Sequence, residues 1–288
     1  MRIEFDGAER LPAAAHAAGN PPATELRRAF AEQGFVLIPR FLAAAEIEDI
    51  AADLCWLVET QLDLAGGAPG EWGGDAVRRL SRALIGLDAC RPQAQAWIYD
   101  EVNRQPCMFA LASDPRLLVL VRELLSDRIA IHPRLNIVMS MPGEEWHLAP
   151  WHQDGFYGPA LHLVAYLPLQ RTDARNGGLM VAPGQHRQGL RPHGRHDHGV
   201  ASKFLTIAPE EVAGFPERRQ LRLGTGDLLL FDRHLPHSAA PNRSRDVRFA
   251  ITIRYSDLSD PFFAARGWQW RDLAEDGLRA LASQPTQA

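Results

Sequence analysis

Two histidines and one carboxylate in this chain have the residue types and the order that an open iron(II) site requires. Residues 150–157 read Pro-Trp-His-Gln-Asp-Gly-Phe-Tyr, so that His152 and Asp154 are separated by a single residue. In an extended strand, residues two apart point to the same face, which would present both side chains together and direct Gln153 away. One more histidine from another strand would complete a two-histidine, one-carboxylate set that leaves three positions on iron open.

A second histidine-bearing segment supplies the third ligand candidate. A His-x-Asp triplet alone also arises by chance on surface strands, so its value depends on this partner. His237 follows the strand that we expect at residues 227–231 and opens a turn. His234 is the rival ligand, and we expect it to be a turn or rim residue. We therefore predict a metal site made of His152, Asp154 and His237.

The strand that we expect at residues 247–255 carries an arginine in register with this site. Period two places two alternating sets of side chains on opposite faces, namely Arg248, Ala250, Thr252 and Arg254 against Phe249, Ile251 and Ile253. The apolar face must pack against a second layer, whereas the small and polar face suits the lining of a cavity. An arginine there can bind a dicarboxylate through two parallel N–H···O bonds, a geometry that lysine cannot copy. The alternative is a surface arginine on an edge strand, and the register favours the binding function.

Bulk composition limits the class of protein. The chain has 288 residues, of which 46% are hydrophobic and 23% charged, as is typical of a globular protein with a sizeable core. A net charge of −4 argues against a general nucleic-acid or anionic-membrane binder. The three cysteines are far apart, which favours reduced thiols over a zinc site. With neither a signal-peptide pattern nor a run of about 20 apolar residues, we expect a cytoplasmic protein.

The chain divides into a helical half and a strand-rich half. We expect residues 1–23 to be loosely ordered and residues 24–288 to form one domain, with helical support over 24–127, a β core over 128–256 and a tail over 257–288. In the helical part, a helix capped by Thr24 stops at Gly34, a strand covers 35–39, a helix covers 43–62, and 93–125 is helical in two pieces broken near Pro106 and Pro115. Short apolar runs then indicate strands of a sandwich or barrel at 129–132, 134–141, 161–169, 178–182, 204–207, 219–223, 227–231 and 247–255.

Together these motifs resemble the phytanoyl-CoA dioxygenase family of iron(II)/2-oxoglutarate oxygenases, over about residues 26–256. The resemblance rests on ordered segments, which are Gly34–Pro39, Trp151–Gly155, Asn176–His186, Gly226–Phe231, and His237 to Arg248. It implies an α+β, mainly β fold, a double-stranded β-helix (jelly roll) flanked by N-terminal helices. It also implies Fe(II) held by His152, Asp154 and His237, 2-oxoglutarate bound by Arg248, and O2 as the oxidant.

Two departures from the family pattern affect the co-substrate site. Family members often carry a lysine at the position of Met141, where it helps to hold 2-oxoglutarate. We expect Asn136, which shares a strand face with Ser140, to assist instead. Ser238 stands where the family often has glycine, and its hydroxyl could bind the co-substrate carboxylate or stabilise the turn.

Aromatic and basic residues near the motifs are the candidates for a substrate pocket. We predict that Phe156, Tyr157, Trp146 and Arg191 line it, with Trp72 as a further aromatic candidate and core packing as the alternative for the rings. His186, His193, His196 and His198 crowd a loop that we interpret as a cap over the pocket rather than as a second metal site.

The resemblance implies a hydroxylase that acts on an unactivated C–H bond of a small molecule, a natural-product intermediate or an acyl compound, and releases succinate and CO2. We predict no catalytic side chain beyond the metal ligands. Desaturation, epimerisation and cyclisation remain open as outcomes, whereas halogenation is disfavoured because Asp154 is present. The competing classes are a non-catalytic jelly roll that binds a metal or ligand and a zinc hydrolase. The sequence assigns neither the substrate nor the oligomeric state.

Overall fold

The computed structural model describes residues 22–67, 74–91, 94–133, 135–144, 148–158, 161–197 and 205–265. The expectations for the first 21 residues, and for the tail beyond residue 265, lie outside these ranges. Helices come first along the chain: α2 (Ala23–Gln33), α3 (Ala44–Leu64), α4 (Ala76–Cys90), α5 (Ala94–Val102), α6 (Pro106–Ala112) and α7 (Pro115–Leu124), with β1 (Phe35–Ile38) after the first. None of the helices in the described ranges is long and apolar enough to cross a membrane.

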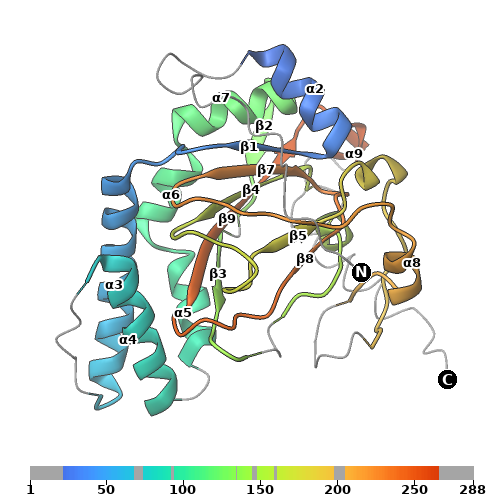
Figure 1. The fold of residues 1–288 in the computed structure, drawn as a ribbon. Coiled ribbons are helices and arrows are strands. Elements are labelled where there is room, and N and C mark those ends of the chain that lie inside the picture. The colour runs from blue at the N-terminus through green and yellow to red at the C-terminus, as the bar shows by residue number, and fades with distance from the viewer. Residues whose placement is uncertain are drawn as a thin grey trace.

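A six-stranded antiparallel sheet forms the centre of the molecule (Figure 1). Its strands are β1, β2 (Ile129–Ile131), β3 (Asn136–Ser140), β4 (Leu163–Pro168), β7 (Leu228–Asp232) and β9 (Arg248–Asp257). The order is β1-β7-β4-β9-β2, and β3 pairs with β9 next to β2, at residues 248–252 of the long strand. Strand β9 therefore organises the sheet, because β2, β3 and β4 all pair with it.

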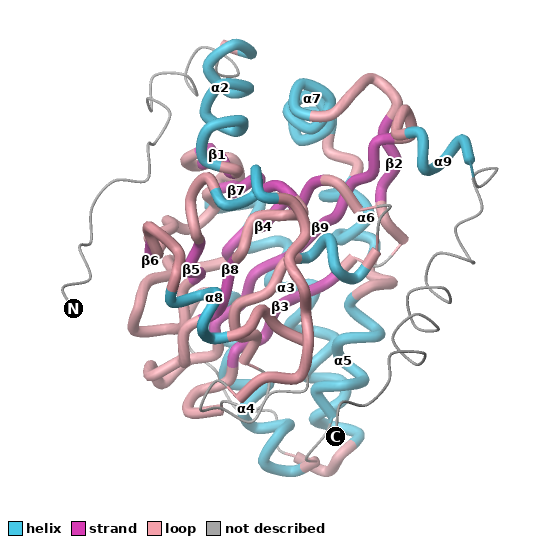
Figure 2. The backbone as a smooth tube through the Cα atoms, turned by 90° about the vertical axis from the view of Figure 1, so that its right-hand side faces the viewer, coloured by secondary structure: helices cyan, strands magenta, loops and turns pink. Residues whose placement is uncertain are grey.

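A smaller three-stranded sheet lies against the large one, in the order β6-β5-β8. Its strands are β5 (Leu179–Val181), β6 (Arg219–Gln220) and β8 (His237–Ala239). Short connections complete the fold, namely η1 (Asp154–Tyr157), η2 (Gln185–Gln188), α8 (Pro209–Ala213) and α9 (Pro261–Ala265). Figure 1 shows α3 and α4 side by side at the left of the strands, and α8 at the opposite side of the molecule; Figure 2, which looks from that opposite side, shows α8 in front of the strands.

Two apolar clusters hold these layers together, and the alternation along β9 divides its residues between them. Phe249, Ile251 and Ile253 pack with the helices in the larger cluster. Ala250 belongs to a second cluster that joins strands of the two sheets, with members such as Phe231 and Val181. The prediction of two different faces for this strand is therefore confirmed.

The structure corrects several predicted elements. Helix α4 was not predicted, although Asp75 caps it by accepting a hydrogen bond from the Arg78 N–H. Residues 93–125 form three helices rather than two pieces, because Pro106 and Pro115 each start a new helix. The strand predicted at 204–207 is wrong, since its described part makes only one isolated bridge, from Thr206.

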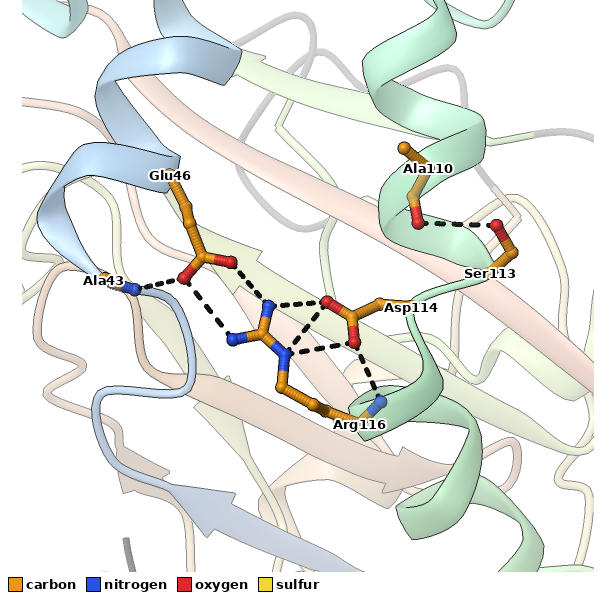
Figure 3. Close-up of polar contacts among 6 residues, drawn as sticks. All are labelled: Ala43, Glu46, Ala110, Ser113, Asp114 and Arg116. Carbon is orange, nitrogen blue, oxygen red and sulfur yellow. Dashed lines mark hydrogen bonds and ion pairs between the residues drawn. The ribbon is translucent and has the colours of Figure 1, made fainter. Parts of the chain in front are cut away.

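Charged side chains link the N-terminus of α3 to the N-terminus of α7 (Figure 3). The Glu46 carboxylate accepts a hydrogen bond of 2.7 Å from the Ala43 N–H at the N-terminus of α3. The Arg116 guanidinium donates to Glu46 at 2.5 Å and to both oxygens of Asp114, the residue that caps α7. Arg116 thereby joins two helix N-termini that are far apart in the sequence.

One glycine is required where β1 and β7 begin to diverge. Gly226 has a φ of 76°, and its carbonyl accepts a hydrogen bond of 2.9 Å from the Leu42 N–H. A Cβ atom at this position would lie 2.3 Å from the Leu42 carbonyl oxygen. A side chain is therefore excluded both by the backbone conformation and by the close approach of the two segments.

The Arg116 link should contribute to stability. We expect Arg116→Ala to lower the free energy of unfolding by about 1 kcal/mol, because the three charged groups are partly exposed and solvent screens them. Arg28→Gln, which removes an exposed pair with Glu32 on a single helix, is the matched control and should change it by less than about 0.5 kcal/mol. Urea denaturation measures both, and equal effects of the two substitutions would contradict this role for Arg116.

Candidate metal centre

Two of the predicted ligands are held together by the backbone. His152 forms an isolated antiparallel bridge with His237. The His152 N–H donates to the His237 carbonyl at 2.9 Å, and the His237 N–H donates back to the His152 carbonyl at 3.0 Å. As a result, the centroids of the two imidazole rings lie 4.2 Å apart. His237 is the first residue of β8 and does not open a turn, which corrects the predicted local structure.

The carboxylate comes from the next turn of the chain. Gln153 is extended, and η1 begins at Asp154. One Asp154 oxygen lies 3.7 Å from His152 Nε2. The ligand atoms of His152, Asp154 and His237 all lie within 4.8 Å of one another, and all three residues are buried. Within the described ranges this is the one group of three or more side chains that could hold a metal ion.

Hydrogen bonds orient both imidazole rings. His152 Nδ1 lies 2.8 Å from the Pro150 carbonyl oxygen, and His237 Nδ1 lies 3.0 Å from the Leu235 carbonyl oxygen. A carbonyl oxygen only accepts, so each Nδ1 carries the proton and each Nε2 presents a lone pair. This arrangement is the usual one for metal-binding histidines.

Electrostatics keep the three groups in the protonation states that a cation needs. Burial lowers the pKa of His152 to about 4 and also lowers the pKa of His237. Burial alone would raise the pKa of Asp154, but the Arg254 guanidinium together with His237 and His152 outweighs burial, and the pKa of Asp154 lies below its usual range. Near neutral pH the site therefore offers two neutral imidazoles and one carboxylate, a donor set that fits iron(II).

The residue between the ligands fastens the centre to the surrounding loop. Gln153 is completely buried. Its amide donates to the Gly189 and His234 carbonyls at 2.9 and 2.6 Å and accepts from the Arg191 N–H at 2.8 Å. Its backbone N–H donates to His193 Nε2 at 3.0 Å. Sequence reasoning directed this side chain away from the metal but did not identify its four partners.

Arg248 lies on the inner face of the large sheet, as predicted from the alternation of β9. It is 2% exposed, and its guanidinium donates to the Tyr166 hydroxyl at 2.7 Å and to the Asn176 carbonyl at 3.2 Å. Asn136 lies opposite Thr252 in the β3–β9 ladder. The Thr252 hydroxyl is buried without a hydrogen-bond partner in the described ranges. These polar groups on one inner surface fit a co-substrate that carries oxygen atoms of its own.

The structure does not support Ser238 as a co-substrate contact. Ser238 follows His237 in β8, so its side chain points to the opposite face of the small sheet. Its partner across the ladder, Met180, packs against an outer cluster that contains Trp151. Met141, at the position of the family lysine, is buried in the main core cluster.

Of the predicted substrate-pocket residues, some lie in the loops around the metal centre and others lie outside the described residues. Phe156 lies in η1 and stacks on His193, with ring centroids 4.5 Å apart. The Arg191 guanidinium donates to Glu211 and Gln185, which makes it a structural residue of the loop. Trp146, Trp72 and His198 lie outside the described residues, as does the side chain of Tyr157.

A cleft of about 540 Å³ opens away from this centre, between the N-termini of α3 and α4 and the loops around Arg175 and Asp246. It contains none of the three predicted ligands. Asn176 lines the cleft, and its carbonyl oxygen accepts the hydrogen bond from Arg248 Nε. The cleft therefore lies next to a residue that holds Arg248 in place. We therefore assign the metal and co-substrate site to the inner surface between the two sheets, and not to this cleft.

Solved structures have the same arrangement of sheets and helices. The epimerase SnoN in complex with Fe3+, α-ketoglutarate and nogalamycin RO has a TM-score of 0.55, with 20% identity over 82% of this chain and 84% of that one. AviO1 from Streptomyces viridochromogenes Tue57 has a TM-score of 0.56, with 19% identity over 83% of this chain and 96% of that one. The predicted mainly β fold with flanking helices is confirmed.

Sequence comparisons agree with this fold. The 1-deoxypentalenic acid 11-beta-hydroxylase of Streptomyces arenae is 32% identical over 154 residues, which cover 48% of this chain and about half (52%) of that protein. The ectoine dioxygenase of Halomonas elongata is 27% identical over 267 residues, which cover 82% of this chain and 72% of that protein. The family model "Phytanoyl-CoA dioxygenase (PhyH)" matches residues 30–250, a range that includes all three clustered ligands and Arg248. The chain belongs to the phytanoyl-CoA dioxygenase family.

Proposed function

We propose that this protein is an iron(II)- and 2-oxoglutarate-dependent oxygenase that hydroxylates a small molecule. The observation that carries the proposal is the buried cluster of two neutral histidines and one carboxylate, with Arg248 on the same inner surface. The named relatives support it, since one is a hydroxylase and another a dioxygenase. The net charge of −4 supports a small molecule rather than a nucleic acid as the substrate.

The ligands assigned to iron are His152 Nε2, His237 Nε2 and one oxygen of Asp154. Three protein ligands leave room for other molecules at the metal. The Nδ1–H bonds to Pro150 and Leu235 hold the two rings in place, and the Asp154–Arg254 contact of 3.3 Å holds the carboxylate. A rigid arrangement of this kind limits which part of a substrate can reach the reacting atoms.

Arg248 would bind the carboxylate of 2-oxoglutarate that is remote from the metal. Tyr166 and Asn176 occupy two of its nitrogens and fix the plane of the guanidinium, which leaves further N–H donors for the co-substrate. Asn136 and Thr252 would add hydrogen bonds from the same surface. The buried position of this arginine excludes water and strengthens the pairing with a carboxylate.

When bound, iron and 2-oxoglutarate would supply the oxidising power: 2-oxoglutarate would be converted to succinate and CO2, with one atom of O2 entering succinate and the other a C–H bond of the substrate. The protein contributes position and protection from solvent, with no side chain required as an acid or base.

The metal assignment is tested by absorption spectroscopy. We expect that adding Fe(II) and 2-oxoglutarate without oxygen produces a weak visible band, and that His152→Ala and Asp154→Ala each abolish it by removing a ligand. The control is His234→Ala, which removes the rival histidine and should retain the band.

Either of two results would contradict this assignment. One is a band that survives His152→Ala and disappears in His234→Ala. The other is retention of zinc with hydrolytic activity that does not need 2-oxoglutarate, which would identify a zinc hydrolase.

The role of Arg248 is tested by co-substrate affinity. We expect Arg248→Gln to raise the KM for 2-oxoglutarate by about tenfold or more, because a charge-assisted pair contributes about 1.5–3 kcal/mol. Arg248→Lys should recover only part of this loss, since an ammonium group lacks the planar fork of donors. Succinate release measures both, with Arg175→Gln in the outer cleft as the control. An unchanged KM in Arg248→Gln would contradict the assignment.

A further inference from the structure

A second arginine stands beside the metal centre and is not required to bind the co-substrate. Arg254 lies on the same face of β9 as Arg248, six residues further along the strand. At about 3.3 Å per residue, the two Cα atoms are about 20 Å apart. Arg254 Nε lies 3.3 Å from an oxygen of Asp154, so this arginine is at the metal end of the inner face.

The Arg254 guanidinium has N–H donors that no described residue uses. Its Nε is occupied by Asp154, whereas neither Nη atom has a hydrogen-bond partner among the described residues. The side chain is 21% exposed, although Asp154 beside it is only 6% exposed. The two Nη atoms form the edge of the guanidinium that Asp154 does not occupy, next to a buried centre. An edge with two parallel N–H groups matches a carboxylate.

The charges of the loaded site leave this arginine without full compensation. Fe(II) with Asp154 and two neutral histidines would carry one net positive charge, because each imidazole donates its Nδ1 proton to a backbone carbonyl and only Asp154 adds a negative charge. The two negative charges of 2-oxoglutarate offset this charge and that of Arg248. The Asp154 charge is counted once, toward the metal, so the positive charge of Arg254 is left without a matching negative charge in a partly buried position, which is costly. An anionic group of the substrate would neutralise it.

Two other arginines near the centre are already engaged. Arg191 pairs with Glu211 at 3.2 Å, and Arg233 donates to the Leu161 carbonyl at 3.2 Å. Arg254 thus combines a position beside the metal with an open donor edge.

We propose that the Nη edge of Arg254 binds an anionic group of the substrate, a carboxylate or a group of similar shape, while its Nε continues to hold Asp154. This inference rests on the proposed oxygenase function and assigns the substrate class. Because Arg254 contacts a metal ligand, the anchor would place the oxidised carbon of the substrate near its anionic group.

Binding of small acids and their neutral analogues tests this assignment. The protein would be loaded with saturating Zn(II) and 2-oxoglutarate, so that Arg248 is occupied and the metal is diamagnetic. Dissociation constants for benzoate, benzamide, acetate and acetamide would then be measured by saturation-transfer NMR. We expect the wild type to bind each acid at least about tenfold more tightly than its amide.

Variants assign this preference to one side chain. Arg254→Gln should weaken the binding of benzoate by about tenfold and bring it close to that of benzamide, whereas Arg254→Lys should retain part of the preference because it keeps the charge. Arg28→Gln removes a distant surface charge and should leave all four constants unchanged. If the acids and amides bind equally to the wild type, if no acid binds, or if Arg254→Gln and Arg254→Lys bind benzoate as the wild type does, the inference is overturned.

A parallel sample with Fe(II) separates this inference from the oxygenase proposal. If the visible band forms in the wild type but the acid preference is absent, only the assignment of Arg254 fails. If no band forms, the oxygenase proposal itself fails. The band also shows that Arg254→Lys and Arg254→Gln still fold and still bind metal and co-substrate.

Discussion

The pair of backbone hydrogen bonds between His152 and His237 is the constraint on which the metal centre depends. These bonds, of 2.9 and 3.0 Å, join two segments that are far apart in the sequence and place the imidazole rings next to each other. His237 also pairs with Val181 of β5. The bridge to His152 therefore adds one more paired residue to the small sheet, on the free side of β8. The distance between the ligands is therefore set by a β ladder, whose geometry is much less variable than that of a loop.

The alternation of side chains along the strands then places the residues of the site and the residues of the core on opposite faces. Around the centre, Trp151 and Gln153 point outward to the apolar cluster and the loop, while His152 points inward. Along β9, Phe249 and Ile251 enter the core under the helices while Arg248 remains on the inner face. A charged group is costly to bury unless it is paired, and each buried charge here has a partner or an assigned ligand. Asp154 meets Arg254, and Arg248 meets Tyr166 and Asn176 before any co-substrate binds.

Most of the site could be predicted because its members repeat with the period of a strand or follow directly from a strand end. His152, Asp154 and Arg248 could be placed on common faces by counting residues in twos. The partners of those residues could not, because Tyr166 and Asn176 approach Arg248 from elements whose pairing depends on the whole fold. Gln153 carries no sequence signal that shows which loop carbonyls it will meet.

The errors in the predicted fold have similar causes. Strand β8 has only three residues and begins at a histidine, so hydrophobic alternation could not reveal it. The apolar run at 204–207 has the composition of a strand, but its described part makes a single bridge at Thr206. Helix α4 follows a glycine-rich segment, and its signal was the Asp75 cap with apolar residues such as Leu80 and Leu84 at helical spacing. Local pattern predicts the type of an element better than its partners.

A crystal structure of the protein grown without oxygen in the presence of Fe(II) and 2-oxoglutarate tests the central claim most directly. Anomalous scattering at the iron edge would locate the metal independently of the protein chain. We expect one iron bound by His152 Nε2, His237 Nε2 and an Asp154 oxygen, with the remote carboxylate of 2-oxoglutarate on Arg248. Iron bound elsewhere, or a co-substrate carboxylate that does not meet Arg248, would contradict it.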